Sequence, residues 1–320
     1  MNVSSELVPE YLFRVVDFNY DWIQGQRTGT GVPHVPKDLK TIFKVNYPPL
    51  PQQKKISKII STVDSVIEKT ESAIAKYQAI KQGLMHDLFT RGIDVNTGKL
   101  RPTPQEAPDL FKESALGLIP RDWEVDELGE FIEAIDPQPS HRTPPEFHNG
   151  TPYLGINDIQ NGEVQLSKCR LVNPEVLIEH KKRYSISEGD IIFGKIGTIG
   201  SPKRLSLPQS YSLSANVILI KPFRNKDLVY HYLNSKNVEN QISRKIHTTS
   251  QPAFGMEKIR SLLFFNIPQI ETNILEKKLN SIDQKIQTEQ QALAKYQQLK
   301  AGLLQDLLTG RVAVSVEEEI

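Results

Sequence analysis

Residues 73–90 read AIAKYQAIKQGLMHDLFT, and residues 292–309 read ALAKYQQLKAGLLQDLLT. They belong to a longer repeat, because the segment from Pro49 to Thr90 recurs as Pro268 to Thr309 at a constant offset of 219 residues and without a gap. Within each copy the mainly apolar positions are spaced alternately four and three apart, which is the period of a coiled-coil seam. The sequence therefore predicts two long helices, each with one apolar stripe that must be buried.

The simplest way to bury both stripes is to pack the two helices against each other, antiparallel, on either side of a domain that folds alone. Both seams are polar at the same two places, Thr70 with Lys81 and Glu289 with Lys300. We expect Thr70 to approach Lys300 and Lys81 to approach Glu289, which would favour one register. Periodicity alone leaves an alternative open, a helical hairpin or homodimeric zipper that says nothing about function.

Composition limits the classes of protein and the compartment. A chain of 320 residues has room for two domains, or for one domain with long helices. Its formal net charge is +1, so any basic surface for nucleic acid must be local. Its one cysteine, Cys169, allows neither a disulfide framework nor a cysteine zinc site, and is expected to be a packed small residue. With no signal peptide and no bilayer-length apolar run, we expect a cytoplasmic protein.

Between the two helices the pattern is that of a mixed domain. The stretch from Gly92 to Arg121 is rich in proline and polar residues and is predicted to be a loop. Short apolar clusters at 153–156, 190–193 and 217–220 predict strands, and residues 227–243 predict a helix. The expected fold class is therefore α+β, a globular domain plus two long antiparallel coiled-coil helices.

The repeat also sets the expected domain boundaries. The same offset pairs Tyr11 with Tyr230 and Thr30 with Thr249, so residues 1–48 look like the end of a second copy of the globular domain. The predicted segments are 1–48, a first helix at 49–92, the complete domain at 93–265, a second helix at 266–310, and a tail at 311–320. The apolar residues of the first segment need cover from this chain or from another molecule: Val15, Phe18, Trp22 and Phe43.

Four motifs carry a family resemblance. They are PPLPQQKKI at 48–56 leading to STVD at 61–64, KQGLMHDL at 81–88, LGLIPRDWEV at 116–125 and EGDIIFGKIGTIG at 188–200. With them the chain resembles the specificity subunits of type I restriction-modification systems, over essentially its whole length. The resemblance implies two target-recognition domains that each read one half of a split DNA site, held apart by two antiparallel helices. Here residues 1–48 would be the C-terminal remnant of a truncated first target-recognition domain.

The resemblance implies a non-catalytic subunit with several partners. These are double-stranded DNA, modification (methyltransferase) subunits that dock on the helices, and a restriction (translocase/endonuclease) subunit. No cofactor is expected in this chain, whereas S-adenosylmethionine, ATP and Mg²⁺ are expected on the partner subunits. A truncated first domain further implies a homodimer or a complementary chain. No membrane partner is expected.

Residues that could touch DNA are those with paired donors and acceptors on exposed loops. The predicted contacts are Arg142, Thr143, Tyr153, Asn157, Asp158, Lys181, Lys182, Arg183, Lys195, Thr198, Thr249, Ser250 and Gln251. The loop 140–143 precedes two prolines and should be exposed, and the resemblance makes it face a groove. Tyr153, Asn157 and Asp158 follow a strand; the structural alternative is a buried tyrosine with an Asx turn.

The other predicted contacts have ordinary alternatives as well. The segment GKIGTIG at 194–200 lets the backbone approach a phosphate closely, with Lys195 and Thr198 as donors, but it could equally be a tight hairpin turn. It is neither a Walker A loop nor a dinucleotide fingerprint. The basic run 180–183 could be a solvated face. The polar loop 249–251 offers Gln251 as a partner for adenine.

Two other functions are alternatives to DNA recognition. Asp158 with Glu179 and Lys181 imitates the acidic-acidic-lysine spacing of metal-dependent nucleases, although Glu-x-Lys occurs by chance in most chains of this length. The second alternative is a coiled-coil scaffold that does not read DNA, which would assign no function to the loops of residues 123–265. The sequence favours the DNA-recognition subunit over both.

Overall fold

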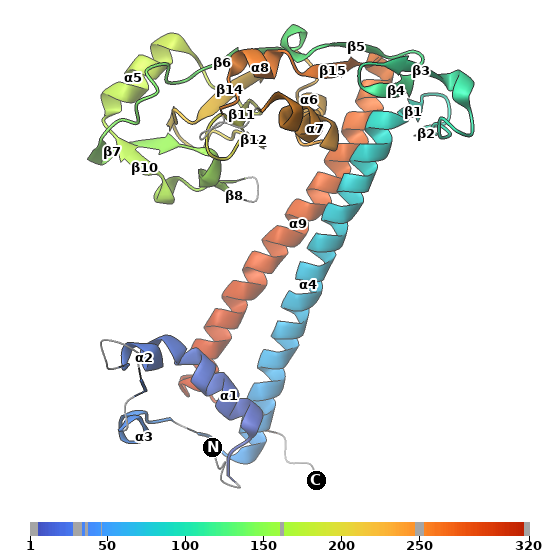
Figure 1. Ribbon diagram of the computed structural model, residues 1–320. Helices are drawn as coiled ribbons and strands as arrows, with labels where there is room; N and C mark the ends of the chain where they lie inside the picture. The colour runs from blue at the N-terminus through green and yellow to red at the C-terminus, as the bar shows by residue number, and fades with distance from the viewer. Residues whose placement is uncertain are drawn as a thin grey trace. The chain divides into compact units, whose positions relative to one another are not determined.

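The computed structural model describes residues 6–27, 34–35, 38–45, 47–160, 163–246 and 253–316. They form two compact units, one of Met1–Lys76 with Thr288–Ile320 and one of Tyr77–Gln287. Two long helices, α4 (Leu50–Thr90) and α9 (Gln269–Leu308), each contribute one part to each unit (Figure 1). The two helices predicted from the repeat are thereby confirmed.

In both units α4 and α9 are antiparallel and joined by an ion pair. Lys300 Nζ lies 2.7 Å from Asp64 in the first unit, and Lys81 Nζ lies 2.5 Å from Asp283 in the second. These are the same contact made twice, since the offset of 219 residues relates Asp64 to Asp283 and Lys81 to Lys300. The predicted partners of the seam lysines were wrong. Each lysine instead reaches an aspartate next to the opposite seam, because the antiparallel register sets Lys81 level with Asp283. Glu289 lies six residues, about 9 Å, further along α9.

The first unit carries three short helices, α1 (Pro9–Phe18), α2 (Tyr20–Gly25) and α3 (Leu39–Ile42). Its core is formed by Tyr11, Val15, Ile56, Ile60, Leu307 and Leu308, with Phe18 and Phe43 packed against it. Arg14 on α1 forms an ion pair of 2.5 Å with Asp64. The chain itself therefore covers most of the apolar residues singled out above, whereas Trp22 stacks on Phe43 and stays 44% exposed.

A four-stranded antiparallel sheet forms the centre of the second unit. Its strand order is β12 (Gly200–Arg204), β11 (Ile191–Gly194), β14 (Val217–Pro222) and β6 (Ile132–Ile135). The central strand β11 is apolar throughout, and β14 is apolar from Val217 to Ile220, because both faces of the sheet are covered there. Ile191 and Phe193 point into one core with the long helices, and Ile192 points into a second core on the other face.

Smaller elements surround this sheet. A second sheet has the order β10 (Arg170–Val172), β7 (Glu146–Leu154) and β13 (Ser212–Leu213), and helix α5 (Pro174–Arg183) follows β10. The three strands predicted at 153–156, 190–193 and 217–220 are confirmed with shifted ends. The predicted helix 227–243 is two helices, α6 (Lys226–Leu233) and α7 (Lys236–Lys245), and α8 (Met256–Arg260) comes later.

The prediction of a loop from Gly92 to Arg121 was wrong. This stretch folds into two hairpins, β1 (Ile93–Asp94) with β2 (Lys99–Leu100), and β3 (Phe111–Ser114) with β4 (Gly117–Pro120). Strand β5 (Glu124–Glu127) then pairs with β15 (Leu263–Asn266) immediately before α9. A further small hairpin joins β8 (Ile159–Gln160) to β9 (Glu163–Val164).

A buried carboxylate joins these hairpins to α9. Glu271 has no exposed surface and accepts hydrogen bonds from the Ile93 amide at 2.6 Å and from the Trp123 indole nitrogen at 2.9 Å. Two Arg101 nitrogens donate to its two oxygens at 2.6 and 2.9 Å. Gly92 is required beside this network, because a Cβ there would lie 2.3 Å from both Arg101 and Glu271.

Candidate nucleic-acid interface

Three of the segments predicted to contact DNA meet around Asp136, which directly follows β6. They are the loop between β6 and β7, the last turn of α5, and the turn between β11 and β12. Asp136 Oδ2 accepts a hydrogen bond from Lys195 at 2.9 Å, and its backbone carbonyl accepts one from Arg183 at 2.9 Å. The fold thus brings Lys195 to Asp136, which lies 59 positions earlier in the sequence.

The loop between β6 and β7 presents Arg142 and Thr143 to solvent, as predicted. Its tip is held by a backbone hydrogen bond of 2.9 Å from His141 to the Gln138 carbonyl. His141 has a φ of 53°, in the left-handed region that a non-glycine residue rarely adopts. The tip is therefore a hydrogen-bonded turn with one defined backbone conformation, and Arg142 and Thr143 are exposed beside it.

Lys195 is not an exposed donor. It is 4% exposed, and besides Asp136 it donates to His141 Nδ1 at 3.1 Å. Its ammonium is already balanced by a carboxylate of 11% side-chain exposure. Lys195 thus supports the neighbouring loop, and a direct phosphate contact by Lys195 stays a prediction.

The segment 194–200 is a hairpin turn, the ordinary alternative considered above. Gly194 is required because a Cβ there would lie 1.7 Å from the Thr198 carbonyl, and Gly197 and Gly200 have φ values of 75° and 85°. Thr198 is exposed in this turn. We call residues 140–143 and 197–199 together the reading rim.

The basic residues at the end of α5 make different contacts. Arg183 donates to the Pro137 carbonyl at 3.0 Å as well as to that of Asp136, so its guanidinium holds the base of the loop. Lys182 is exposed and pairs with Glu179 at 2.7 Å, and this partner lowers the pKa of the Glu179 carboxyl. Lys181 is exposed and lies 3.4 Å from the Ser210 hydroxyl. The side chains of Lys181 and Lys182 are therefore exposed to solvent, which matches the ordinary alternative for this basic run.

Tyr153 and Asp158 have the structural roles named as alternatives. Tyr153 is 4% exposed, and its hydroxyl accepts a hydrogen bond of 2.8 Å from the Ala215 amide; burial raises its pKa. Asp158 Oδ2 accepts one of 2.7 Å from the Gly155 amide and so caps its own turn. Asn157 is exposed.

Asp158, Glu179 and Lys181 are not arranged as a metal-dependent nuclease site would require. Asp158 is engaged in its own turn, and Glu179 pairs with Lys182 rather than with Lys181. In the part of the chain that the structure describes, no three histidine, cysteine or acidic side chains are grouped so that they could hold a metal ion. Cys169 is buried, and burial raises the pKa of its thiol to about 11, which fits the predicted packed residue.

Thr249, Ser250 and Gln251 lie outside the described residues. The described chain resumes at Ala253, which pairs with Ile196 in the turn between β11 and β12. The next amide, that of Phe254, donates to the Lys195 carbonyl at 2.9 Å. The backbone that follows this polar stretch is therefore attached to residues 195 and 196, directly before the reading rim segment 197–199.

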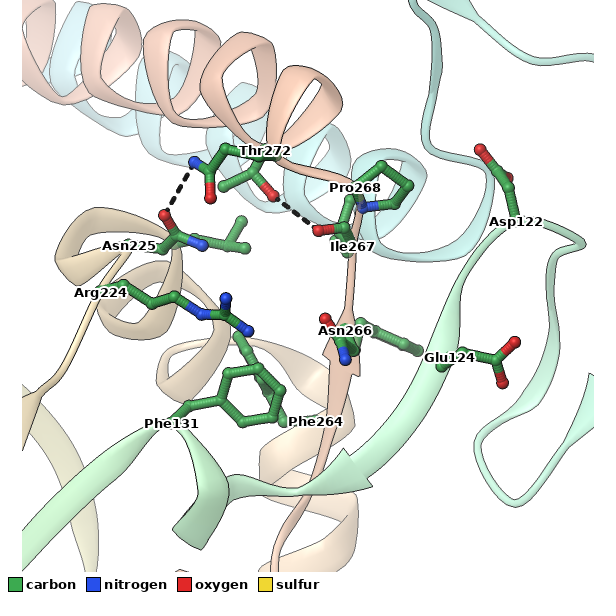
Figure 2. Close-up of a pocket in the computed structure, with 13 residues that line it drawn as sticks. Asp122, Glu124, Phe131, Arg224, Asn225, Phe264, Asn266, Ile267, Pro268 and Thr272 are labelled. Carbon is green, nitrogen blue, oxygen red and sulfur yellow. Dashed lines mark hydrogen bonds between the residues drawn. The ribbon is translucent and has the colours of Figure 1, made fainter.

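Sequence reasoning missed two features of this unit, one within the site and one outside it. Asp136 and Gln138 organise the loop, but they are single polar residues without a motif, so no sequence signal marks them. A cavity of about 320 Å³ beside the start of α9 was also missed (Figure 2). Arg224 lines it and lies over the Phe131 ring at 5.5 Å. Phe131 directly precedes β6, so Arg224 is at the opposite end of that strand from the loop between β6 and β7.

No helix in the described part of the chain is long and apolar enough to cross a membrane. The cytoplasmic location stays a prediction.

Comparison with known proteins connects this architecture to one family. The type I restriction modification DNA specificity domain matches residues 120–305. The type I restriction enzyme MjaVIII specificity subunit of Methanocaldococcus jannaschii is 27% identical over 318 residues, covering 95% of this chain and 70% of that protein. The putative MjaX specificity subunit of the same organism is 25% identical over 279 residues, covering 85% of this chain and 60% of the relative.

A solved structure shares the fold. The type I restriction-modification S subunit from M. genitalium aligns with a TM-score of 0.56 at 15% identity, covering 95% of this chain and 73% of that one. The α+β class with long helices is thereby confirmed. Because the matched domain spans more than half of the chain, the protein belongs to the type I restriction modification DNA specificity family.

Proposed function

We propose that this chain is the DNA-recognition subunit of a type I restriction-modification complex and is not itself an enzyme. It reads a half-site through residues 123–265 and uses its paired helices as a spacer and docking platform. The observation that carries the proposal is the family match over residues 120–305, which includes both the reading rim and most of α9.

The chemistry of the reading rim supports direct base reading. Arg142 has a planar fork of donors that can pair with the O6 and N7 of guanine, while Thr143 and Thr198 can contact bases or phosphates. The formal net charge of +1 provides little general attraction to DNA. We therefore expect tight, sequence-specific binding only when partner subunits add phosphate contacts.

Two glycines on the long helices support a docking role. Gly83 and Gly302 are exposed, lie inside helices, and would have no atom within 4 Å of an added Cβ. A helix-interior glycine costs about 1 kcal/mol relative to alanine, so nothing inside the chain favours it. Both copies of the repeat nevertheless have it, three residues after an exposed apolar side chain, Ile80 at 45% and Leu299 at 52%. A partner that approaches the helix backbone closely would account for both features.

The partners and cofactors follow from this role. We propose that modification subunits dock on the two equivalent faces and that a restriction subunit joins the same complex. S-adenosylmethionine, ATP and Mg²⁺ would then bind to those subunits and not to this chain.

As a spacer, the helix pair should set the distance between half-sites. Four residues inserted after Ala75 add about 6 Å, or roughly two base pairs of reach. An unchanged spacing in the methylated motif would contradict the spacer role.

A homodimer is a further proposal for the first unit. Phe13 on α1 is 62% exposed, although Tyr232, its counterpart in the repeat, is completely buried. A second copy, or a complementary chain, could cover this face. Light scattering of the purified protein distinguishes a dimer from a monomer, and mapping of the methylated motif distinguishes a symmetric site from an asymmetric one.

The decisive experiment compares methylated motifs in host DNA with and without this gene. Loss of one bipartite motif on deletion is the expected result, and an unchanged methylome would refute the proposed function. Arg142→Ala should relax one base position of that motif. Arg224→Ala is the matched control, since Arg224 is also exposed in the same unit but lies at the far end of β6.

A further inference from the structure

The loop between β6 and β7, which we call the reading loop, is held by the side-chain amide of the half-buried residue Gln138. Gln138 Nε2 donates to the Ser140 hydroxyl at 3.0 Å and to the Arg142 carbonyl at 3.4 Å. The Arg142 amide in turn lies 3.5 Å from the same hydroxyl. Gln138 therefore contacts the backbone of Arg142, the residue whose side chain is proposed to read a base.

The other end of that amide is bound to a buried histidine of α5. Gln138 Oε1 lies 2.7 Å from His180 Nε2, and His180 is only 3% exposed. The other ring nitrogen, Nδ1, lies 2.9 Å from the Tyr184 hydroxyl. Residues 180 and 184 are one helical turn apart, so they lie on one face of the end of α5.

Hydrogen-bond polarity fixes the direction of this chain of contacts. The Arg142 carbonyl can only accept, so the Gln138 amide nitrogen must face it and its oxygen must face His180. His180 Nε2 must then carry a proton and donate it, and Nδ1 must accept from the Tyr184 hydroxyl. Burial, followed by the nearby Arg183 charge, lowers the pKa of His180, which agrees with this neutral tautomer.

Neighbouring contacts fix the base of the same loop. Arg183 binds two consecutive carbonyls, those of Asp136 and Pro137, and the backbone N–H of Gln138 donates to Asp136 Oδ1 at 3.0 Å. The left-handed φ of His141 requires such support, because an unsupported loop would relax to an ordinary conformation. The position of Arg142 is thus set by α5 and not by the loop alone.

We propose that Gln138 and His180 are positioning residues that determine which base the Arg142 loop reads. The inference rests on the proposed DNA-recognition role and deepens it. Neither residue reaches DNA in this scheme, since both act through the backbone of Arg142. Substitutions at these two positions should therefore change specificity at one base pair without abolishing recognition of the rest of the site.

Gln138→Glu is the most selective test. The carboxylate still accepts from His180, but it cannot donate to the Arg142 carbonyl and instead places a second acceptor against it. Gln138→Met removes the contacts with Ser140, Arg142 and His180 while keeping the length of the side chain, and His180→Phe removes the histidine donor. Glu175→Gln, an exposed change at the other end of α5, is the matched control. Thermal unfolding of each variant shows whether it folds.

The readout is the methylated motif in cells that carry the complete complex. Gln138→Glu should reduce discrimination at one base position about tenfold, at the same position as Arg142→Ala. In an Arg142→Ala background, Gln138→Glu should add no further change at that position, because both act through one contact. The other bases of the motif should stay unchanged.

A uniform loss of methylation at every site, or an effect that adds to that of Arg142→Ala, would overturn the inference. So would a relaxed base at a different position. If deletion of the gene abolishes the motif but Arg142→Ala leaves it intact, the loop does not read DNA. This inference then fails, while the recognition role stands.

Discussion

Replacing Gly83 and Gly302 with alanine should stabilise the free chain and weaken its assembly, two effects of opposite sign. An added Cβ meets nothing within 4 Å at either position, so alanine contributes only its better helix propensity. This gain is about 1 kcal/mol per site. Gly83 lies in the unit of Tyr77–Gln287, about 200 residues, where this gain should raise the unfolding midpoint by roughly 2–4 °C. Gly302 lies in the smaller unit, about 110 residues, where the rise should be roughly 4 °C or more.

The loss of assembly follows from the proposed close approach of a partner to the helix backbone. A methyl group placed into a well-packed contact costs about 1–3 kcal/mol, which weakens binding roughly 5- to 150-fold per site. Gln82→Ala is the matched control, because position 82 is exposed and its repeat counterpart is already Ala301. It should leave assembly unchanged.

Two measurements on the same proteins decide the matter. Circular dichroism during heating gives the stability of the free chain, and calorimetric titration with the purified modification subunit of the same system gives the affinity. A variant with a raised midpoint and wild-type affinity would refute the docking role of the glycines. A lowered midpoint would refute the account of Gly83 and Gly302 as open helix positions.

Three further predictions concern the second unit. Glu271→Gln should destabilise it by about 3 kcal/mol in urea denaturation, because the Arg101 guanidinium loses its buried counter-charge and keeps the half-exposed Asp122 carboxylate, which solvent screens; an unchanged midpoint would contradict this account. Burial lowers the pKa of His231 to about 4 from 6.5, so the unfolded state binds the proton more readily and stability falls as the pH drops from 6.5 towards 4, by about 3 kcal/mol. His231→Gln should flatten the free energy of unfolding over that range, and an equally steep curve would exclude this histidine as the cause. Lys81→Asp should destabilise the helix pair by roughly 1 kcal/mol, and adding Asp283→Lys should restore part of the loss; no recovery in a thermal double-mutant cycle would show that the pair contributes nothing.

The long helices could be predicted because their signal is repeated. The seam period continues over ten positions in each copy, and the copies agree with each other. The ion-pair partners could not be predicted from the seam, since Lys81 and Lys300 reach aspartates just outside it. The long lysine side chain can reach an aspartate outside the seam, and the spacing of apolar residues does not indicate which aspartate it reaches.

The hairpins between Gly92 and Arg121 were missed for a different reason. Their strands have only two to four residues, too few for an alternating pattern to show. At the site, two prolines were enough to predict the exposed loop 140–143. The burial of Lys195 depends on Asp136, which is 59 residues away, so no local pattern could indicate it.

The antiparallel helix pair has a consequence for synthesis. When the end of α4 is made, all of residues 91–268 must still be translated before α9 begins. At about 5–20 residues per second, this takes roughly 10–35 s. Throughout that interval the nascent chain carries an apolar seam whose final partner does not yet exist. Slow translation of the central domain lengthens the exposure, so the yield of folded protein in cells should depend on codon speed between the two helices and on chaperones that bind the growing chain.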